Sequence, residues 1–346
     1  MKKVLSVFAV LVVAMVCVFS QGTKESAVTQ NENQTDAQSV QQGEERTLTV
    51  YAYDTFCGDW GAAGSIIPAF EEKTGIKVNL VAAGNASEVL NKVMLEGDKT
   101  QCDVIVGISD DMAEKAYPIL QSYQSPYLET IDPKYIFDAE NRLIPYDYGF
   151  FGFVMDNTAN LTVPENLLDL TKEQYIDKVI LIDPRGGSAV GLGLMMWTKN
   201  VLGDGWTDWW KTMSENALTM TSGWSAAWGL FTEGEAPIVI SYTSSTIYDE
   251  TGTQTALIFD HGHEATIEAA GIVKGSNHLS EAQEFIDFLI TDGQLDLGIA
   301  NAMYPVNSTI ELPASYDNAP KPDEFFLNSD TQVSQALEEL TNAVWR

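Results

Sequence analysis

Short apolar segments alternate with helix-like segments in the first third of this chain, and this alternation limits its fold more than any other feature. Residues 48–53, 77–82 and 103–108 are apolar runs of strand length. The segments between them repeat apolar residues at helical spacing and end near Gly75 and Gly97, as helices commonly do. Strands and helices in this order build a parallel sheet with helices on both faces. We therefore predict an α/β lobe here.

A second set of alternating segments follows, and two long extended segments separate it from the first. Strands are predicted at 178–182, 217–221 and 237–242, again with helical segments between them. The extended segments at 143–155 and 265–273 are long enough to cross between lobes. The predicted fold is therefore α/β and two-lobed, with a ligand cleft between lobes that crossing strands join. The predicted domains are lobe 1 at 47–147 plus 268–346 and lobe 2 at 148–267.

The first residues of the chain predict export. Residues 1–20 carry two lysines followed by an apolar core, which is typical of a secretory signal peptide. Two fates remain open, namely cleavage before Gln21 and lipidation of Cys17, although Val16 is bulkier than the small residue that usually precedes a lipidated cysteine. Residues 21–46 are polar and have little to bury, so we predict a disordered linker there. The predicted location is the periplasm, either free or anchored through Cys17.

The composition excludes one class of partner. The chain of 346 residues has a formal net charge of −30 at pH 7. Nucleic-acid binding needs clustered Lys and Arg to neutralise phosphates, so we expect none. An acidic surface favours solubility, and it could also attract a cationic ligand, although solvation is the simpler explanation. We expect a monomer.

The cysteines and histidines offer little for catalysis or for binding a metal. Cys57 follows the first predicted strand and Cys102 precedes the third, so a parallel sheet holds them at opposite ends as free thiols. A Cys57–His pair would require His261 or His263 to fold back over the cleft. We expect no catalytic residue, no cofactor and no metal ligand, although a tyrosine pair with carboxylates could hold ferric iron.

Candidate ligand contacts gather where predicted strands end. A helix with Trp224 leads into the strand 237–242, and aromatic rings and hydroxyls follow at its carboxyl end, where open α/β sheets hold ligands. Tyr53 and Asp54 follow the first strand in the same way, and the turn at 301–305 carries another ring. This pattern predicts a pocket for a flat, polar small molecule. The residues of the strand end and the turn are Tyr242, Ser244, Ser245, Tyr248 and Tyr304.

A glycine-rich segment at 183–193 follows another predicted strand and opens a helix. Free backbone N–H groups and the positive end of the helix dipole make such a turn suitable for an anion. Gly187 and Ser188 are the candidates for a phosphate or carboxylate contact. A tight turn with close helix packing explains the same glycines equally well.

Seven segments of the chain, in this order, resemble one family. They are YAYDTFCGDWG, CDVIVGISDD, IPYDYGFFGFVMD, DPRGGSAVGLGLMMW, SGWSAAWGLFTEGE, SYTSSTIY and AMYPV. From Leu48 to Arg346 the chain resembles the thiamine-binding members of the extracellular solute-binding proteins that serve bacterial ABC importers. The resemblance implies a type II-like periplasmic binding protein fold that closes over thiamine, thiamine monophosphate or thiamine diphosphate. It also implies delivery of the ligand to a permease in the membrane.

The resemblance also implies roles for individual residues. Rings that contact the ligand would be Tyr53, Trp224, Tyr242 and Tyr248, with hydroxyls at Ser244 and Ser245, and the phosphate side would include Gly187, Ser188, Asn85 and Ala86. The chain departs from the family in having Ala302 where a tryptophan is usual and Asn85 where an acidic residue is usual. Both departures weaken the case for thiamine itself more than for a thiamine-like ligand. The alternatives are a ferric iron or polyamine receptor of the same fold and, as an enzyme, a thiaminase I-like protein that uses Cys57.

Overall fold

The alternation of strands and helices is present in the computed structural model, which describes residues 46–59 and 61–346. The predicted signal peptide, Cys17 and all but the last residue of the predicted linker lie outside these residues. The strands are β1 (Thr47–Ala52), β2 (Lys77–Ala82), β3 (Val104–Ser109), β4 (Leu120–Gln121), β5 (Ile144–Asp156), β6 (Val179–Ile182), β7 (Thr219–Thr221), β8 (Ile238–Tyr242), β9 (Gln254–Leu257), β10 (His263–Val273), β11 (Tyr304–Pro305) and β12 (Phe325–Phe326). The α-helices are α1 (Asp54–Cys57), α2 (Ala63–Thr74), α3 (Ala86–Glu96), α4 (Ala113–Ala116), α5 (Ala189–Leu202), α6 (Trp206–Asn216), α7 (Trp224–Thr232), α8 (Leu279–Leu289), α9 (Gln294–Asn301) and α10 (Asp330–Val344).

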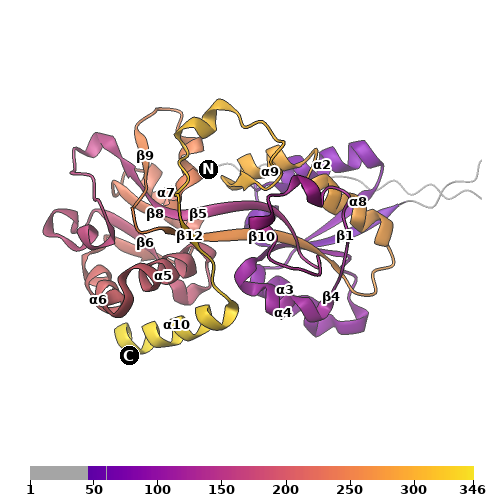
Figure 1. Cartoon of the computed structure of the whole chain (residues 1–346), viewed down its shortest axis with the longest axis horizontal. Helices are drawn as coiled ribbons and strands as arrows, with labels where there is room; N and C mark the ends of the chain where they lie inside the picture. Colours follow the sequence, from indigo (N-terminus) through magenta and orange to yellow (C-terminus); the bar gives the residue numbers. More distant parts are fainter. Residues whose placement is uncertain (1–45, 60) are drawn as a thin grey trace, which may run out of the picture. The chain divides into compact units, whose positions relative to one another are not determined.

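The strands form one sheet whose order is β2-β1-β3-β10-β5-β8-β6-β7. β1, β2 and β3 are parallel at one end, and β6, β7 and β8 are parallel at the other. β5 and β10 run antiparallel to their neighbours in this order and connect the two groups of strands (Figure 1). β5 pairs with β10 along its first half and with β8 along its second half. The prediction of a two-lobed α/β fold joined by crossing strands is confirmed.

Strands β1 and β3 of the first lobe are covered on both faces, whereas the edge strand β2 is partly exposed. Leu48, Val50 and Ala52 of β1 point to one face, where they pack with Phe70 of α2 and with α8. Tyr51 points to the other face, toward α3. Alternation of side chains along a strand produces this division, and a strand covered on both sides needs apolar residues at nearly every position. The continuous apolar runs of the sequence are therefore explained.

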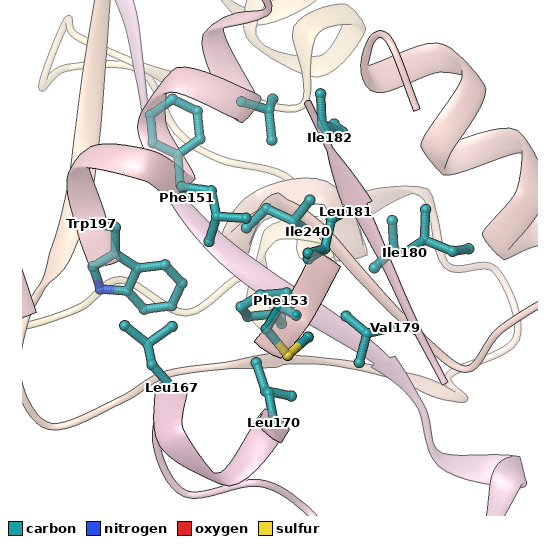
Figure 2. Packing of buried hydrophobic residues seen from close by; sticks show 14 of the residues in the cluster. Phe151, Phe153, Leu167, Leu170, Val179, Ile180, Leu181, Ile182, Trp197 and Ile240 are labelled. Atoms are coloured by element: carbon teal, nitrogen blue, oxygen red, sulfur yellow. The ribbon is translucent and has the colours of Figure 1, made fainter. Parts of the chain in front are cut away.

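The core of the second lobe is built around β6, whose four residues are all buried. Figure 2 shows Trp197 of α5 beside Phe153 of β5, with Leu167 and Leu170 on the same side. The Trp197 ring also stacks on His263, with 4.4 Å between ring centroids. α5 approaches β5 closely at Gly193, where a Cβ atom would lie 2.2 Å from the Phe151 ring. One glycine of the predicted glycine-rich segment thus has a packing role.

The C-terminal helix α10 packs against α5 and α6 of the second lobe. Its buried residues Val333, Ala336 and Leu340 belong to the same apolar core as β6. The predicted domain boundary assigned all of 268–346 to the first lobe, and α10 differs from that assignment. An amphipathic helix at the end of a chain packs on whichever apolar surface its connection can reach, and the sequence did not show which surface that was.

We expect His263 to make the folded protein sensitive to acid. Its Nε2 accepts a hydrogen bond from the Phe259 N–H at 2.9 Å, and its Nδ1 lies 2.7 Å from the Phe151 carbonyl oxygen. Burial lowers the pKa of His263 from 6.5 to about 4, so the folded protein holds the imidazole neutral. A lowered pKa of this kind contributes stability that is complete above the ordinary value and is lost as the pH falls through it.

We predict that the free energy of unfolding decreases by up to about 1.4 kcal/mol per pH unit, from roughly pH 6.5 to pH 4, because of His263. Chemical denaturation at several pH values measures this slope. The His263→Gln variant keeps a donor and an acceptor but has no charge to gain, so its slope should be smaller. Equal slopes for the two proteins would show that other groups cause the acid sensitivity.

Candidate ligand-binding site

The predicted site residues lie at the carboxyl edges of the two parallel groups of strands. In the first lobe Tyr53 and Asp54 follow β1, and Gly84 to Ala86 follow β2. In the second lobe Gly187 follows β6, Trp224 follows β7 and Tyr242 ends β8. Parallel strands bring these ends to the same edge of each lobe, as expected for a ligand site in an open α/β sheet.

Two carboxyl groups occupy the strands that cross between the lobes. Glu268 of β10 and Asp147 of β5 are directly opposite each other in the antiparallel register. Glu268 Oε2 accepts hydrogen bonds from the Tyr53 hydroxyl at 3.1 Å and the Tyr146 hydroxyl at 2.8 Å. Asp147 is fully buried, and its Oδ2 accepts a hydrogen bond from Asn301 Nδ2 at 2.8 Å. Asp147 Oδ1 is buried without a hydrogen-bond partner in the described part of the chain.

The two strands that flank Glu268, β3 and β5, each contain a β-bulge. On β3 the register shifts at Gly107, and on β5 it shifts at Tyr146. Gly107 has a φ of +88°, and a Cβ atom there would lie 2.1 Å from the ring of Tyr53. The Tyr53 ring therefore rests on the backbone of a glycine that no larger residue could replace without displacing it. Bulges redirect side chains locally, and these two direct two tyrosine hydroxyls onto one carboxylate.

Tyr242 comes to the same group from the second lobe. Its ring lies 5.2 Å from that of Phe151, which is opposite it on β5. Burial raises the pKa of Tyr242 well above 10, and the nearby charges of Glu268 and Asp147 raise it further. The Tyr242 hydroxyl has no hydrogen-bond partner among residues 46–59 and 61–346. We call the five residues that meet here the hinge cluster: Tyr53, Tyr146, Asp147, Tyr242 and Glu268.

The hinge cluster is acidic, and none of its five residues carries a positive charge. Burial raises the pKa of Asp147 well above its ordinary value, Glu268 raises it further, and only the Asn301 hydrogen bond opposes this. Burial also raises the pKa of Glu268, while the hydroxyls of Tyr146 and Tyr53 oppose the shift. The three tyrosines keep their protons at neutral pH because their pKa values are raised. Two carboxyl groups beside aromatic rings suit a flat cation.

The aromatic residues that were predicted to contact the ligand lie in two separate parts of the structure. Trp224 Nε1 donates to Ser241 Oγ at 2.7 Å, and Ser241 is next to Tyr242 on β8. Neighbouring residues of a strand point to opposite faces, so Trp224 and Tyr242 lie on opposite faces of β8. The Trp224 ring stacks on Trp228 at 5.7 Å with an interplanar angle of 12°, and Tyr248 meets Trp228 edge-on. Trp224 is half-buried, and a site contact for it stays a prediction.

Four predicted hydroxyl contacts are hydrogen-bonded within the protein. Ser245 Oγ lies 2.7 Å from Ser241 Oγ, and Tyr248 donates to the Ala300 carbonyl at 2.8 Å. Ser244 donates to the carbonyl of Ala302, which is fully buried, and Tyr304 donates to that of Ala319. Tyr304 is 1% exposed and stacks on Tyr148 in the core of the first lobe. Ser244 and Tyr248 hold the turn after β8 against the segment 300–302, and ligand contacts of all four hydroxyls stay predictions.

The first-lobe loops that were predicted to touch the ligand hold each other. Asp54 Oδ1 accepts from the Gly84 N–H at 2.9 Å, which links the ends of β1 and β2. Asn85 is the N-cap of α3 and forms a capping box with Glu88, in which each side chain accepts from the other residue's N–H. Ala86 is the first residue of α3. Asp54 and Asn85 thus stabilise the rim of the first lobe.

The glycine-rich turn keeps the features of an anion site. Gly187 is exposed and left-handed, with a φ of +75°, and Ser188 is the N-cap of α5. The Ser188 side chain makes no capping hydrogen bond, so the first N–H groups of α5 are not capped by it. At Gly186 a Cβ atom would lie 3.1 Å from the Ser222 carbonyl, so this turn is adjacent to the segment that begins α7. The segments that lead into α5 and α7 therefore lie side by side.

Sequence reasoning missed four residues of the site, and three of them give a signal in the sequence. Asp147 and Glu268 are acidic residues inside apolar runs that were predicted to be buried crossing strands, and a buried carboxylate requires a reason. Gly107 lies inside an apolar strand, where glycine often marks a bulge. Tyr146 precedes Asp147 and gave no separate signal.

The structure gives little support to a reactive thiol or to a metal site made of His, Cys, Asp and Glu alone. Cys57 and Cys102 are free, as predicted. Burial and the nearby Asp54 carboxylate raise the pKa of the Cys57 thiol to about 11, whereas a nucleophilic thiol needs a lowered value. His278 lies 3.1 Å from Asp103 at the opposite edge of β3. Within the described residues, no cluster of three or more His, Cys, Asp or Glu side chains is arranged to hold a metal ion.

Comparisons with known proteins agree with this geometry. The profile of a family described as "Bacterial extracellular solute-binding protein" matches residues 61–295. A "Thiamine-binding periplasmic protein" of Brucella abortus is 33% identical over 296 residues, which is 83% of this chain and 88% of that protein. The Escherichia coli protein of that name is 33% identical over 283 residues, 80% of this chain and 85% of that protein.

Solved structures show the same fold. A "Periplasmic thiamin binding protein" superimposes with a TM-score of 0.76 at 30% sequence identity, covering 87% of this chain and 96% of that one. A ferric binding protein from Campylobacter jejuni superimposes with a TM-score of 0.69 at 20% identity, covering 86% of this chain and 98% of that one. At that lower identity the likeness concerns the fold alone.

Proposed function

We propose that this chain, which belongs to the family of bacterial extracellular solute-binding proteins, captures thiamine or a thiamine phosphate for an ABC importer. The thiamine-binding relatives support this choice of ligand because they match the chain over most of its length. The chain would deliver its ligand to a permease in the membrane. We propose that it acts as a receptor and not as an enzyme.

The observation that carries the choice of ligand is the hinge cluster. Thiamine has two flat aromatic rings joined by a methylene group, a permanent positive charge on its thiazolium ring, and ring faces that need apolar partners. Tyr53 and Tyr242 offer rings from the two lobes, and Asp147 and Glu268 offer negative charge between them. A ligand held there would contact both lobes at once, and its contacts would favour their closed arrangement.

The phosphate of a thiamine phosphate would lie at the turn that contains Gly187 and Ser188. The N-terminus of α5, a helix of 14 residues, is uncapped by Ser188, and the beginning of α7 is adjacent to it. Backbone N–H groups and helix dipoles at such a place favour an anion. Trp224, the first residue of α7, would then lie near the phosphate end of the ligand.

A titration with several ligands tests the proposal. The protein would be titrated with thiamine, its mono- and diphosphate and spermidine, while tryptophan fluorescence is followed, and the bound ligand would be recovered afterwards. Binding of thiamine or a phosphate, with intact ligand recovered, is the expected result. Cleaved ligand would establish the thiaminase-like alternative, and Cys57→Ser would then test the nucleophile. Binding of spermidine alone would establish the polyamine alternative.

Ferric iron is the second candidate, because the structure brings tyrosines and carboxyl groups together. Tyr53 and Tyr146 both donate to Glu268, and Asp147 is across the strand pair from it. Iron bound by tyrosinate absorbs visible light, so addition of ferric citrate would colour the protein. A colourless protein after this addition excludes the iron alternative.

Export to the periplasm is part of the proposal, and the relatives named as periplasmic proteins support it. Among the helices of the described residues, none has the length and apolar character to cross a membrane. Whether Cys17 is lipidated is tested by mass spectrometry of the exported protein, which distinguishes a lipidated N-terminus from a free Gln21. We also propose that the protein is a monomer, which light scattering would measure.

A further inference from the structure

Asp147 and Glu268 form an unusual pair for the interior of a sheet. They are cross-strand neighbours on β5 and β10, and side chains at such positions have Cβ atoms about 5 Å apart. Asp147 is fully buried, and its Oδ1 has no hydrogen-bond partner in the described chain. Two buried carboxylates at this separation repel each other strongly, so an empty site would retain a proton between them.

We propose that the Asp147–Glu268 pair is the subsite for the cationic ring of the ligand, and that it shares one proton which is released when the cation binds. The inference rests on the proposed function, since it assigns the thiazolium ring to this pair. With one proton the pair has a net charge of −1. When the proton leaves for the solvent and the ring enters, the pair has −2 and the ring +1, so the buried net charge is again −1.

The neighbours of the pair favour this exchange. The described groups around the pair are hydroxyls, an amide and a further acid, and Lys321 donates to the Tyr148 hydroxyl at 2.7 Å instead of to either carboxyl group. These groups carry no positive charge that a ligand would have to displace. The facing groups are Tyr53 after β1, Tyr146 on β5, Tyr242 on β8, Asn301 on α9, Ser109 on β3 and Tyr316 in the segment Ala314–Asn318, and the further acid is Asp111 after β3, near Tyr242.

The protonation of the pair fixes the sign of two pH effects. Burial and mutual repulsion raise the pKa of Asp147 and of Glu268 above their ordinary values. A carboxyl group with a raised pKa favours folding at low pH and loses that contribution as the pH rises through the folded value. The cation binds the deprotonated pair, so affinity for the cation rises over the same range. Ligand-free stability and affinity should therefore change in opposite directions.

Calorimetry tests the release of the proton directly. Thiamine would be titrated near neutral pH in two buffers of different ionisation enthalpy, and the difference in heat gives the number of protons exchanged. We expect release of about one proton per ligand. A deaza analogue, in which a neutral thiophene ring replaces the thiazolium, should release none and bind at least about tenfold more weakly. The analogue retains the aminopyrimidine, so exchange at that ring cancels.

The Asp147→Asn variant should bind thiamine at least about tenfold more weakly, without proton release, and should have a higher melting temperature without ligand. Asp98→Asn, which removes an exposed acid, should change neither property.

Equal affinity for thiamine and the deaza analogue with no proton release would overturn the inference while leaving the proposed function intact. If thiamine does not bind at all, both the inference and the proposed function are wrong. If Asp147→Asn does not fold, the calorimetric titrations of the wild-type protein with thiamine and with the deaza analogue still test the inference.

Discussion

The Gly107→Ala variant is expected to lose both stability and ligand binding. Alanine at a φ of +88° is strained, and its Cβ would lie 2.1 Å from the Tyr53 ring, so the ring must move off Glu268. We expect the free energy of unfolding to fall by roughly 2–3 kcal/mol and the dissociation constant for thiamine to rise at least about tenfold. Denaturation and fluorescence titration measure the two quantities.

Gly275→Ala is the matched control for this prediction. Gly275 has a similar φ of +81°, but a Cβ atom there would meet nothing within 4 Å. Its variant should therefore show the cost of backbone strain, about 1 kcal/mol, and unchanged ligand affinity. Should both variants bind thiamine as wild type does, the bulge at Gly107 would have no part in the site.

The Tyr242→Ala variant has the other large expected effect. The ring is 9% exposed, lies against Phe151 and reaches the carboxyl pair. Removing it should raise the dissociation constant about thirtyfold, or roughly 2 kcal/mol, and lower the free energy of unfolding by about 2–4 kcal/mol. Tyr242→Phe keeps the ring and removes a hydroxyl that has no protein partner in the described chain, so its affinity should remain within a few-fold of wild type.

Tyr175→Ala separates the loss of binding from the loss of stability. Tyr175 is 1% exposed in the same lobe, and its hydroxyl donates to the Thr162 carbonyl at 2.7 Å, away from the hinge cluster. Its variant should lose a similar free energy of unfolding and bind thiamine normally once folded. If the two alanine variants weaken binding equally, Tyr242 acts through folding and not through contact with the ligand.

The two acids of the hinge cluster differ from the surface acids that contribute to the net charge of the chain. A charge of −30 was explained most simply by solvation, and surface acids account for most of it. Asp147 and Glu268 are a different kind of acid, because they are held away from water between two lobes. The overall field attracts a cation from a distance, whereas only a buried pair can select it.

The order of elements and the position of the candidate site along the chain could be predicted from local patterns. Apolar runs of strand length, helix-ending glycines and long crossing strands are local signals, and β2 occupies the predicted residues 77–82. Tyr53 and Tyr242 were predicted from their places at strand ends, which parallel topology brings to one edge. The resemblance to a family added the ligand, and it did not indicate which side chains lie together.

The sequence by itself therefore determined the strand–helix order, the two-lobed fold and the residues that follow each strand, because these depend on neighbours within a few positions. Only the tertiary structure decided that Tyr146 and Glu268, 122 residues apart, share a hydrogen bond beside Asp147. That meeting depends on the register of β5 against β10 and on bulges at Gly107 and Tyr146. A shift of one residue would turn each side chain to the other face, and no local pattern fixes such a register.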